Sequence, residues 1–155
     1  MIRTIDGFHA DDQGDWVAEL SCLHGQHVRH QPPFRDRPWV LTESGRTGRV
    51  GTVIDCPLCD RVELPGGLEL ARTAGPFDQV TLPAALRRDH RVADRTWAVL
   101  RVLAGSVVLE LDTSPPIERR VEAGEDQPIP PDVIHRLRPS SLVRLEIDFL
   151  VANRA

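Results

Sequence analysis

The sequence contains no lysine and no tyrosine, and cysteine occurs only three times. All 19 basic residues are therefore arginines. Without lysine, the chain has neither a Schiff-base nucleophile nor the phosphate-binding lysine of a Walker motif. Without tyrosine, it lacks one of the acids that enzymes commonly place in a barrel. These two absences exclude several classes of enzyme chemistry.

The sequence also lacks a hydrophobic run of the roughly 20 residues that a membrane-spanning helix needs. Its start, MIRTIDGFHADDQGDW, has no apolar core of a secretory signal, so we expect a cytoplasmic protein without a membrane segment. The net charge is −4 at pH 7 and the isoelectric point is about 5.8. An acidic protein of this kind argues against general nucleic-acid binding.

Proline and glycine are frequent, with 13 and 11 residues, and they leave few long stretches free of helix breakers. The composition is that of a globular protein with 41% hydrophobic and 27% charged residues. The sequence therefore predicts a mainly β protein with many turns. The segment Leu64-Pro65-Gly66-Gly67 is typical of a linker, so we predict a small β domain over residues 1–66 and a second domain over residues 67–155.

Short apolar runs separated by turn signals predict the individual strands. In the first domain we expect extended segments over Ile2–Phe8, Trp16–Leu20, His27–His30 and Thr52–Cys59, and a short helical segment capped by Thr42. In the second domain we expect strands at 68–73, 79–82, 97–104, 107–111, 127–129, 134–138 and 142–151. Residues 97–111 are expected to form a central hairpin that turns at Gly105. The expected core residues of this hairpin are Val99, Leu103, Val107, Leu109 and Leu111.

All three cysteines lie in the first domain, in a spacing that predicts a zinc site. Cys56-Pro57-Leu58-Cys59 is a C-x-x-C knuckle, and Cys22 with His24 offers a second pair of ligands. A domain this small usually needs a stabilising cross-link in addition to its core, and a tetrahedral Cys3His zinc site supplies one. His24 is the first choice for the fourth ligand, followed by His27 and then His30. A redox pair at Cys56 and Cys59 is the alternative interpretation.

A local basic segment follows this site in an otherwise acidic chain. Residues 24–49 carry five arginines against two acids. The sequence predicts an anion-binding surface that comprises His27, His30, Arg29, Arg35 and Arg37. A solvated charged face is the alternative interpretation, and nucleic acid is the weaker choice of ligand because few aromatic residues lie nearby.

The run ELSCLHGQHVRHQPPFRDRPWV, followed by Cys-Pro-Leu-Cys, resembles an uncharacterised bacterial domain-of-unknown-function family. That family carries a C-x-H-x-x-H-x-x-H-x-P-P segment and then R-P-W-V and C-x-x-C. The resemblance covers about residues 1–62 and implies no known activity. It therefore supports the zinc site and nothing beyond it.

The second domain resembles the tellurite-resistance-related (TehB-like) cupin family. The resemblance covers residues 68–152 and rests on PAALRRDH, WAVLRVLAGSVVLEL, IPPDVIH and LEIDFLV. It implies a cupin-like antiparallel β-barrel, or jelly roll. It also implies a divalent metal (Zn, Fe or Ni) held by His90, His135 and Asp148, with Glu110 and Glu146 as reserve ligands. Asp132 and Pro139 stand where the cupin motif has glycine and asparagine, and the usual H-x-H is missing.

Two functions remain open at this point. The first is a metal-binding module that binds or senses a small molecule or anion, with a possible link to tellurite, other oxyanions or stress. The alternative is a small metal-dependent cupin enzyme, of the dioxygenase or isomerase type, that acts in the barrel. The sequence favours the first, and it does not decide whether the protein is an enzyme. Cupin barrels often pair through edge strands, so a homodimer also remains open.

Overall fold

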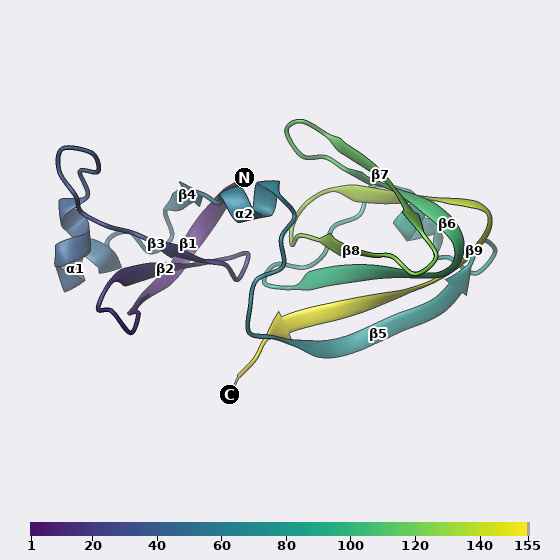
Figure 1. Cartoon of the computed structure of the whole chain (residues 1–155), viewed down its shortest axis with the longest axis horizontal. Helices are drawn as coiled ribbons and strands as arrows, with labels where there is room; N and C mark the ends of the chain where they lie inside the picture. The colour runs from purple at the N-terminus through teal and green to yellow at the C-terminus, as the bar shows by residue number, and fades with distance from the viewer. Residues whose placement is uncertain (155) are drawn as a thin grey trace.

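The computed structural model of the chain describes residues 1–154 and contains two antiparallel sheets (Figure 1). The first sheet has the order β3-β2-β1-β4. Its strands are β1 (Ile2–Ala10), β2 (Trp16–Leu20), β3 (Gly25–His27) and β4 (Val53–Asp55). β1 and β2 form a hairpin around the turn at residues 11–15, in which the Asp11 N–H donates to the Asp15 carbonyl. Because β1 lies between β2 and β4, it brings the chain after β2 close to the chain after β4.

The helices of the N-terminal part are short. They are η1 (Pro38–Leu41), α1 (Glu43–Thr47) and α2 (Pro57–Asp60). The predicted cap of α1 is confirmed, because the Thr42 hydroxyl accepts a 3.1 Å hydrogen bond from the Gly45 N–H. No helix within residues 1–154 is both long and apolar enough to cross a membrane.

The second sheet consists of two long strands with shorter partners. The long strands are β6 (Trp97–Leu111) and β9 (His135–Ala152), and they pair along most of their length. Their neighbours are β5 (Leu68–Asp78), β7 (Ile117–Glu122) and β8 (Asp126–Ile129), and a short helix, η2 (Ala84–Arg87), follows β5. β8 pairs with the first half of β6 and β7 pairs with the second half. The sheet bends between these halves and encloses its own core (Figure 1).

Side-chain alternation decides which face of this bent sheet is the core. Ala98, Leu100 and Val102 of β6 pack with Leu145 and Ile147 of β9 inside the bend. Residues that alternate with them, such as Arg101, Glu146 and Asp148, point to the opposite face. The predicted mainly β fold with a cupin-like antiparallel barrel is thus confirmed. The prediction of a domain boundary at residue 66 stays a prediction, as does a homodimer paired through edge strands.

Some of the predicted elements differ from the structure. Residues 97–111 form one continuous strand, not a hairpin that turns at Gly105. Val99, Val107, Leu109 and Leu111 are buried as predicted, but Leu103 is 46% exposed. The two segments predicted over 134–138 and 142–151 likewise merge into β9, and residues 79–82 form no strand. β7 was not predicted, because its sequence IERRVE buries only Val121 and otherwise reads as polar.

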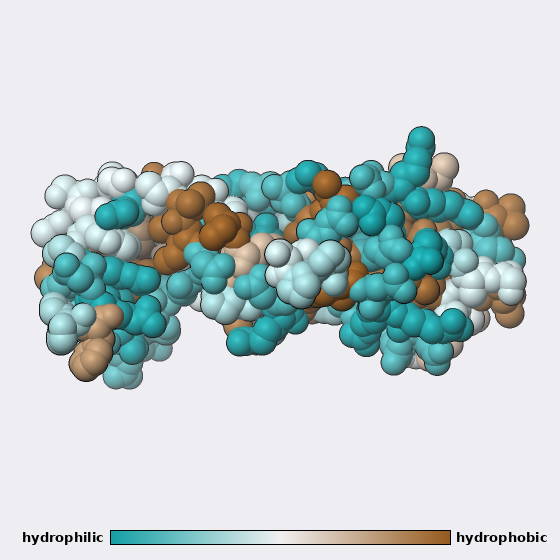
Figure 2. All heavy atoms as spheres, turned by 90° about the horizontal axis from the view of Figure 1, so that it is seen from above, coloured by the Kyte–Doolittle hydropathy of each residue, from teal (hydrophilic) through white to brown (hydrophobic). Residues whose placement is uncertain are grey.

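The face of the molecule in Figure 2 is mostly hydrophilic, with apolar side chains in separate patches. The most exposed of the large apolar side chains are Phe34 and Val80. Scattered exposure of this kind is normal for a folded protein. It does not by itself identify a partner surface.

Gly105 allows β6 to bend where β9 crosses close to it. Its φ of +68° is in the left-handed region, and a Cβ there would lie 1.7 Å from the Leu142 carbonyl oxygen. We expect Gly105→Ala to lower the free energy of unfolding by at least about 2 kcal/mol, because strain and a backbone clash add. The control is Gly124→Ala, which has a φ of +86° but no atom within 4 Å of its Cβ. It should cost only about 1 kcal/mol. Denaturant unfolding of both variants measures the difference, and equal losses would contradict the role of the close crossing.

Candidate metal centre

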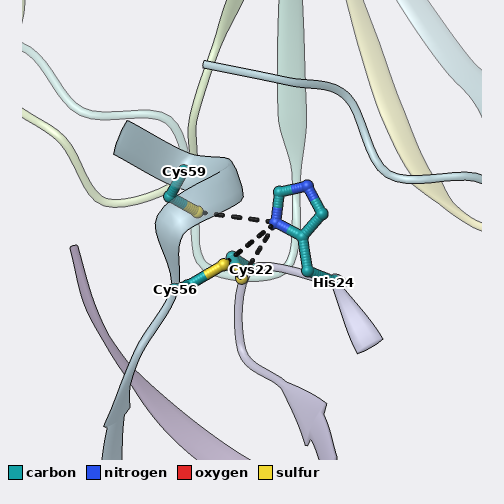
Figure 3. A group of neighbouring side chains, drawn as sticks. All are labelled: Cys22, His24, Cys56 and Cys59. Atoms are coloured by element: carbon teal, nitrogen blue, oxygen red, sulfur yellow. Dashed lines mark hydrogen bonds between the residues drawn. The ribbon is translucent and has the colours of Figure 1, made fainter. Parts of the chain in front are cut away.

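Three cysteines and one histidine meet next to the start of β1. Cys22 and His24 lie in the turn between β2 and β3, whereas Cys56 and Cys59 flank the first turn of α2. β1 holds both segments, because the Ser21 N–H donates to the Thr4 carbonyl and the Cys56 N–H donates to the Met1 carbonyl. All four side chains point toward one another (Figure 3). The C-x-x-C turn is closed by a hydrogen bond from the Cys59 N–H to the Cys56 carbonyl.

The spacing of the four ligand atoms fits a tetrahedral metal site. The Nδ1 atom of His24 lies 3.4, 3.5 and 3.6 Å from the sulfur atoms of Cys22, Cys56 and Cys59. The sulfur atoms of Cys22 and Cys56 are 3.9 Å apart. Zinc bonds of about 2.3 Å to sulfur and about 2.0 Å to nitrogen give tetrahedral edges of about 3.5 Å (S–N) and 3.8 Å (S–S). The cluster could therefore bind a metal ion such as zinc.

Burial places the three thiols where a cation would favour their ionised forms. All four residues are 3% exposed or less. The hydrogen bond with Cys22 lowers the pKa of the Cys56 thiol, whereas the same neighbour raises the pKa of Cys59. One thiol therefore ionises readily and another resists, because their negative charges would be adjacent. A divalent cation between the sulfur atoms removes that repulsion.

The imidazole of His24 is oriented from its other nitrogen. Its Nε2 atom lies 2.8 Å from the Glu63 carbonyl oxygen and donates a hydrogen bond to it, which leaves Nδ1 directed at the sulfur atoms. Burial lowers the pKa of His24, but the hydrogen bonds and charges of Cys22 and Cys56 outweigh this and raise it to about 9. The backbone carbonyl of Glu63 thus orients the His24 ring, a role that the sequence did not indicate.

Two further residues, Trp97 and Arg3, lie beside the cluster. Trp97, which is fully buried at the start of β6, donates a 2.7 Å hydrogen bond from its indole nitrogen to the Cys22 carbonyl. Its ring also packs edge-on against His24, with the centroids 5.5 Å apart. Arg3 is 6% exposed and forms no ion pair with a carboxylate within residues 1–154. Its charge favours the ionised form of Cys59 and would offset a Cys3His centre that carries −1 with a divalent ion.

The predicted anion-binding residues are only partly brought together. His27, Arg29 and Arg35 line a pocket of about 440 Å³, and Arg61 of the C-terminal side of the knuckle completes it. Cys56, Pro57 and Leu58 form the wall that separates this pocket from the metal cluster. His30 and Arg37 lie outside it, because the His30 ring accepts a hydrogen bond from the Arg37 N–H. Arg61 was missed, although it follows Cys59 by two residues.

The predicted barrel ligands do not converge in the same way. His90 and His135 face each other across a β-bridge, with ring centroids 5.4 Å apart. Asp148 lies on the other face of β9, where Arg101 pairs with it at 3.0 Å and the Thr73 hydroxyl donates to it. The reserve residues Glu146 and Glu110 are similarly paired, with Arg101 and with Arg136. In residues 1–154, the Cys22, His24, Cys56 and Cys59 cluster is the one group of three or more such side chains close enough to share an ion.

Trp97 joins the metal cluster to the second sheet, and removal of its indole should affect both. We expect Trp97→Phe to lower the free energy of unfolding by about 2–4 kcal/mol, because it leaves a cavity and an unpaired Cys22 carbonyl. Metal affinity should fall as well, because Cys22 is less firmly held. Trp16→Phe is the control for metal affinity, since Trp16 packs on the same apolar cluster and stacks on Arg46 but, within residues 1–154, its indole donates no hydrogen bond to the turn that carries Cys22. Denaturant unfolding and metal competition with a chelator measure both effects. An unchanged metal affinity in Trp97→Phe would contradict the coupling.

Comparison with known proteins supports both halves of the sequence analysis. Residues 6–63 match the family described as "Protein of unknown function (DUF3565)", and residues 72–147 match the TehB-like domain. No curated protein matches the chain significantly. Among solved structures, a protein from Escherichia coli strain K12 is 22% identical, with a TM-score of 0.53, and the match covers 60% of this chain and 90% of that chain.

TehB from Haemophilus influenzae is 18% identical, with a TM-score of 0.52. That match covers 56% of this chain but only 32% of the TehB chain. At these identities the two structures show a shared fold and nothing about activity. The two resemblances inferred from the sequence are therefore confirmed, and the chain combines a region similar to DUF3565 proteins with a TehB-like domain.

Proposed function

We propose that this protein is a zinc-containing module that binds or senses small anions. The observation that supports the proposal is the common wall of two sites, because Cys56 belongs to the Cys3His cluster and also lines the basic pocket. A zinc ion with four protein ligands has no open coordination position, so its role there is structural. Recognition of the ligand then falls to the arginines of the pocket.

The charge of the pocket favours an anion as its ligand. Arg29, Arg35 and Arg61 line it together with His27, and no acidic residue is among its lining side chains within residues 1–154. Guanidinium groups bind oxyanions through charge-assisted, often bidentate hydrogen bonds. Oxyanions, among them the tellurite implied by the resemblance to the tellurite-resistance-related cupins, are therefore the proposed class of ligand.

A metal-dependent enzyme in the barrel is the alternative. It would depend on a divalent ion at His90 and His135, whose rings lie edge to face, with His135 buried. Burial lowers the pKa of His135, which keeps its ring neutral and able to act as a ligand. A third protein ligand is what this alternative needs, and the carboxylate of Asp148 is engaged by Arg101 on the other face of the strand.

Zinc content distinguishes these possibilities. We expect about one tightly bound zinc per chain, and Cys56→Ser and His24→Ala should lose it because each removes one of four ligands. His27→Ala and His30→Ala are matched controls that should keep it, since both rings lie outside the cluster. Elemental analysis of protein purified without added metal measures the content, and cobalt substitution should give the absorption of a tetrahedral thiolate site.

Two outcomes would change the assignment. Protein that is folded, reduced and free of metal would remove the structural zinc from the proposal. A second, exchangeable ion at saturating supply, lost in His135→Ala but not in Cys56→Ser, would support the barrel enzyme instead.

The anion site has its own prediction. Sulfate and tellurite should raise the midpoint of thermal unfolding more in the wild type than in Arg35→Gln, because only the wild type binds them in the pocket. Comparison with Arg120→Gln, an exposed arginine on β7, cancels the general effect of each salt. Chloride at equal ionic strength should not separate the variants. Identical responses of wild type and Arg35→Gln would argue against an anion site at the pocket.

A further inference from the structure

The positions of the arginines in the basic pocket, and not only their charge, indicate which ligand it binds. Its three arginines come from separate parts of the chain: Arg29 follows β3, Arg35 lies in the next loop and Arg61 follows α2. Two of them have acidic neighbours outside the pocket, since Arg29 pairs with Asp15 at 2.8 Å and Arg61 approaches Glu63 at 3.4 Å. The guanidinium of Arg35 has no ion pair within residues 1–154.

From this arrangement we propose that the pocket binds a small organic phosphate, and that the metal centre controls its affinity. The inference rests on the proposed function and gives it a class of ligand and a means of regulation. It stands on the lining of the pocket, its volume and the position of the knuckle in its wall.

The number of hydrogen-bond donors favours a phosphate over a group with fewer acceptor oxygens. Asp15 and Glu63 offset the charges of Arg29 and Arg61, but each guanidinium keeps further N–H donors, and Arg35 offers its side-chain donors to a ligand. A phosphate monoester brings close to two negative charges and three acceptor oxygens at neutral pH. It can therefore accept hydrogen bonds from several guanidinium groups at once, whereas a carboxylate pairs with a single guanidinium group.

The size of the pocket favours an organic ligand over a free inorganic ion. A volume of about 440 Å³ lies within the roughly 300–1,000 Å³ of pockets that hold small organic molecules. The side chains of Gln26 and Gln31 add amide groups to the lining, and Pro57 and Leu58 add apolar surface. These groups suit hydroxyl groups and carbon atoms next to the phosphate.

The knuckle links this pocket to the metal. Cys56, Pro57 and Leu58 form one wall, and Arg61 is held to the same turn by a hydrogen bond from its N–H to the Pro57 carbonyl. A metal ion that binds Cys56 and Cys59 fixes the turn that positions Arg61. Because binding free energies are reciprocal, an organic phosphate in the pocket must strengthen metal binding by the factor by which the metal strengthens phosphate binding.

Calorimetric titration of the zinc-loaded full-length protein with ribose 5-phosphate and with AMP tests the ligand class. At least one of them should bind at least tenfold more tightly than sulfate, and ribose without phosphate should not bind. Arg35→Gln and Arg61→Gln should each weaken binding tenfold or more, whereas Arg120→Gln should leave it unchanged. Absence of binding by both phosphates, or equal binding to Arg35→Gln and wild type, overturns the ligand class.

A chelator competition tests the link to the metal. Saturating ribose 5-phosphate or AMP, whichever binds, should raise the apparent zinc affinity of the wild type but not that of Arg35→Gln. Arg61→Gln separates the two parts further, because it should keep zinc and lose the phosphate effect. If zinc binds and sulfate stabilises through Arg35 but phosphates neither bind more tightly nor change zinc affinity, only this inference fails. Loss of the zinc itself would defeat the proposed function instead.

Discussion

The convergence of three sulfur atoms and one ring nitrogen is the constraint on which the N-terminal half depends. Cys22 follows β2 and Cys56 follows β4, the two strands that pair with β1. The sheet order β3-β2-β1-β4 therefore brings these cysteines together. The first sheet has only a few buried apolar side chains of its own, and several of them surround the cysteines. A cation bound to the sulfur atoms would therefore contribute what a larger core contributes in a longer domain.

The second sheet obtains its stability in a different way. β6 and β9 run through both halves of the bend. This one pair of strands therefore contributes side chains to both sides of the enclosed core. Ion pairs such as those of Arg101 and Arg136 cover the outer face and leave few acidic groups free there. Asp148 is not beside His135, although both belong to β9, because the two side chains leave opposite faces of the strand and pair with opposite ends of β6.

Local chemistry made the cysteine site predictable from the sequence, whereas long-range packing did not. The C-x-x-C knuckle and the Cys22–His24 pair need only the ordinary spacing of zinc ligands, and the first-choice histidine is the one in the cluster. The cap at Thr42 and the β1–β2 hairpin are equally local. Arg3, Trp97 and the Glu63 carbonyl gave no signal, because their roles depend on segments distant in sequence. The bend at Gly105 was misjudged as a turn, since a positive-φ glycine occurs in both.

The position of Trp97 has a consequence for how the two halves can be separated. Its ring, together with Leu68 and Leu150, fills the apolar cluster around the cysteines although all three belong to the second sheet. A fragment cut at the glycine linker would leave this face of the second sheet in water, and newly exposed apolar surface of that kind promotes self-association. The linker therefore marks a change of sheet along the chain without separating two parts that would each stay soluble alone.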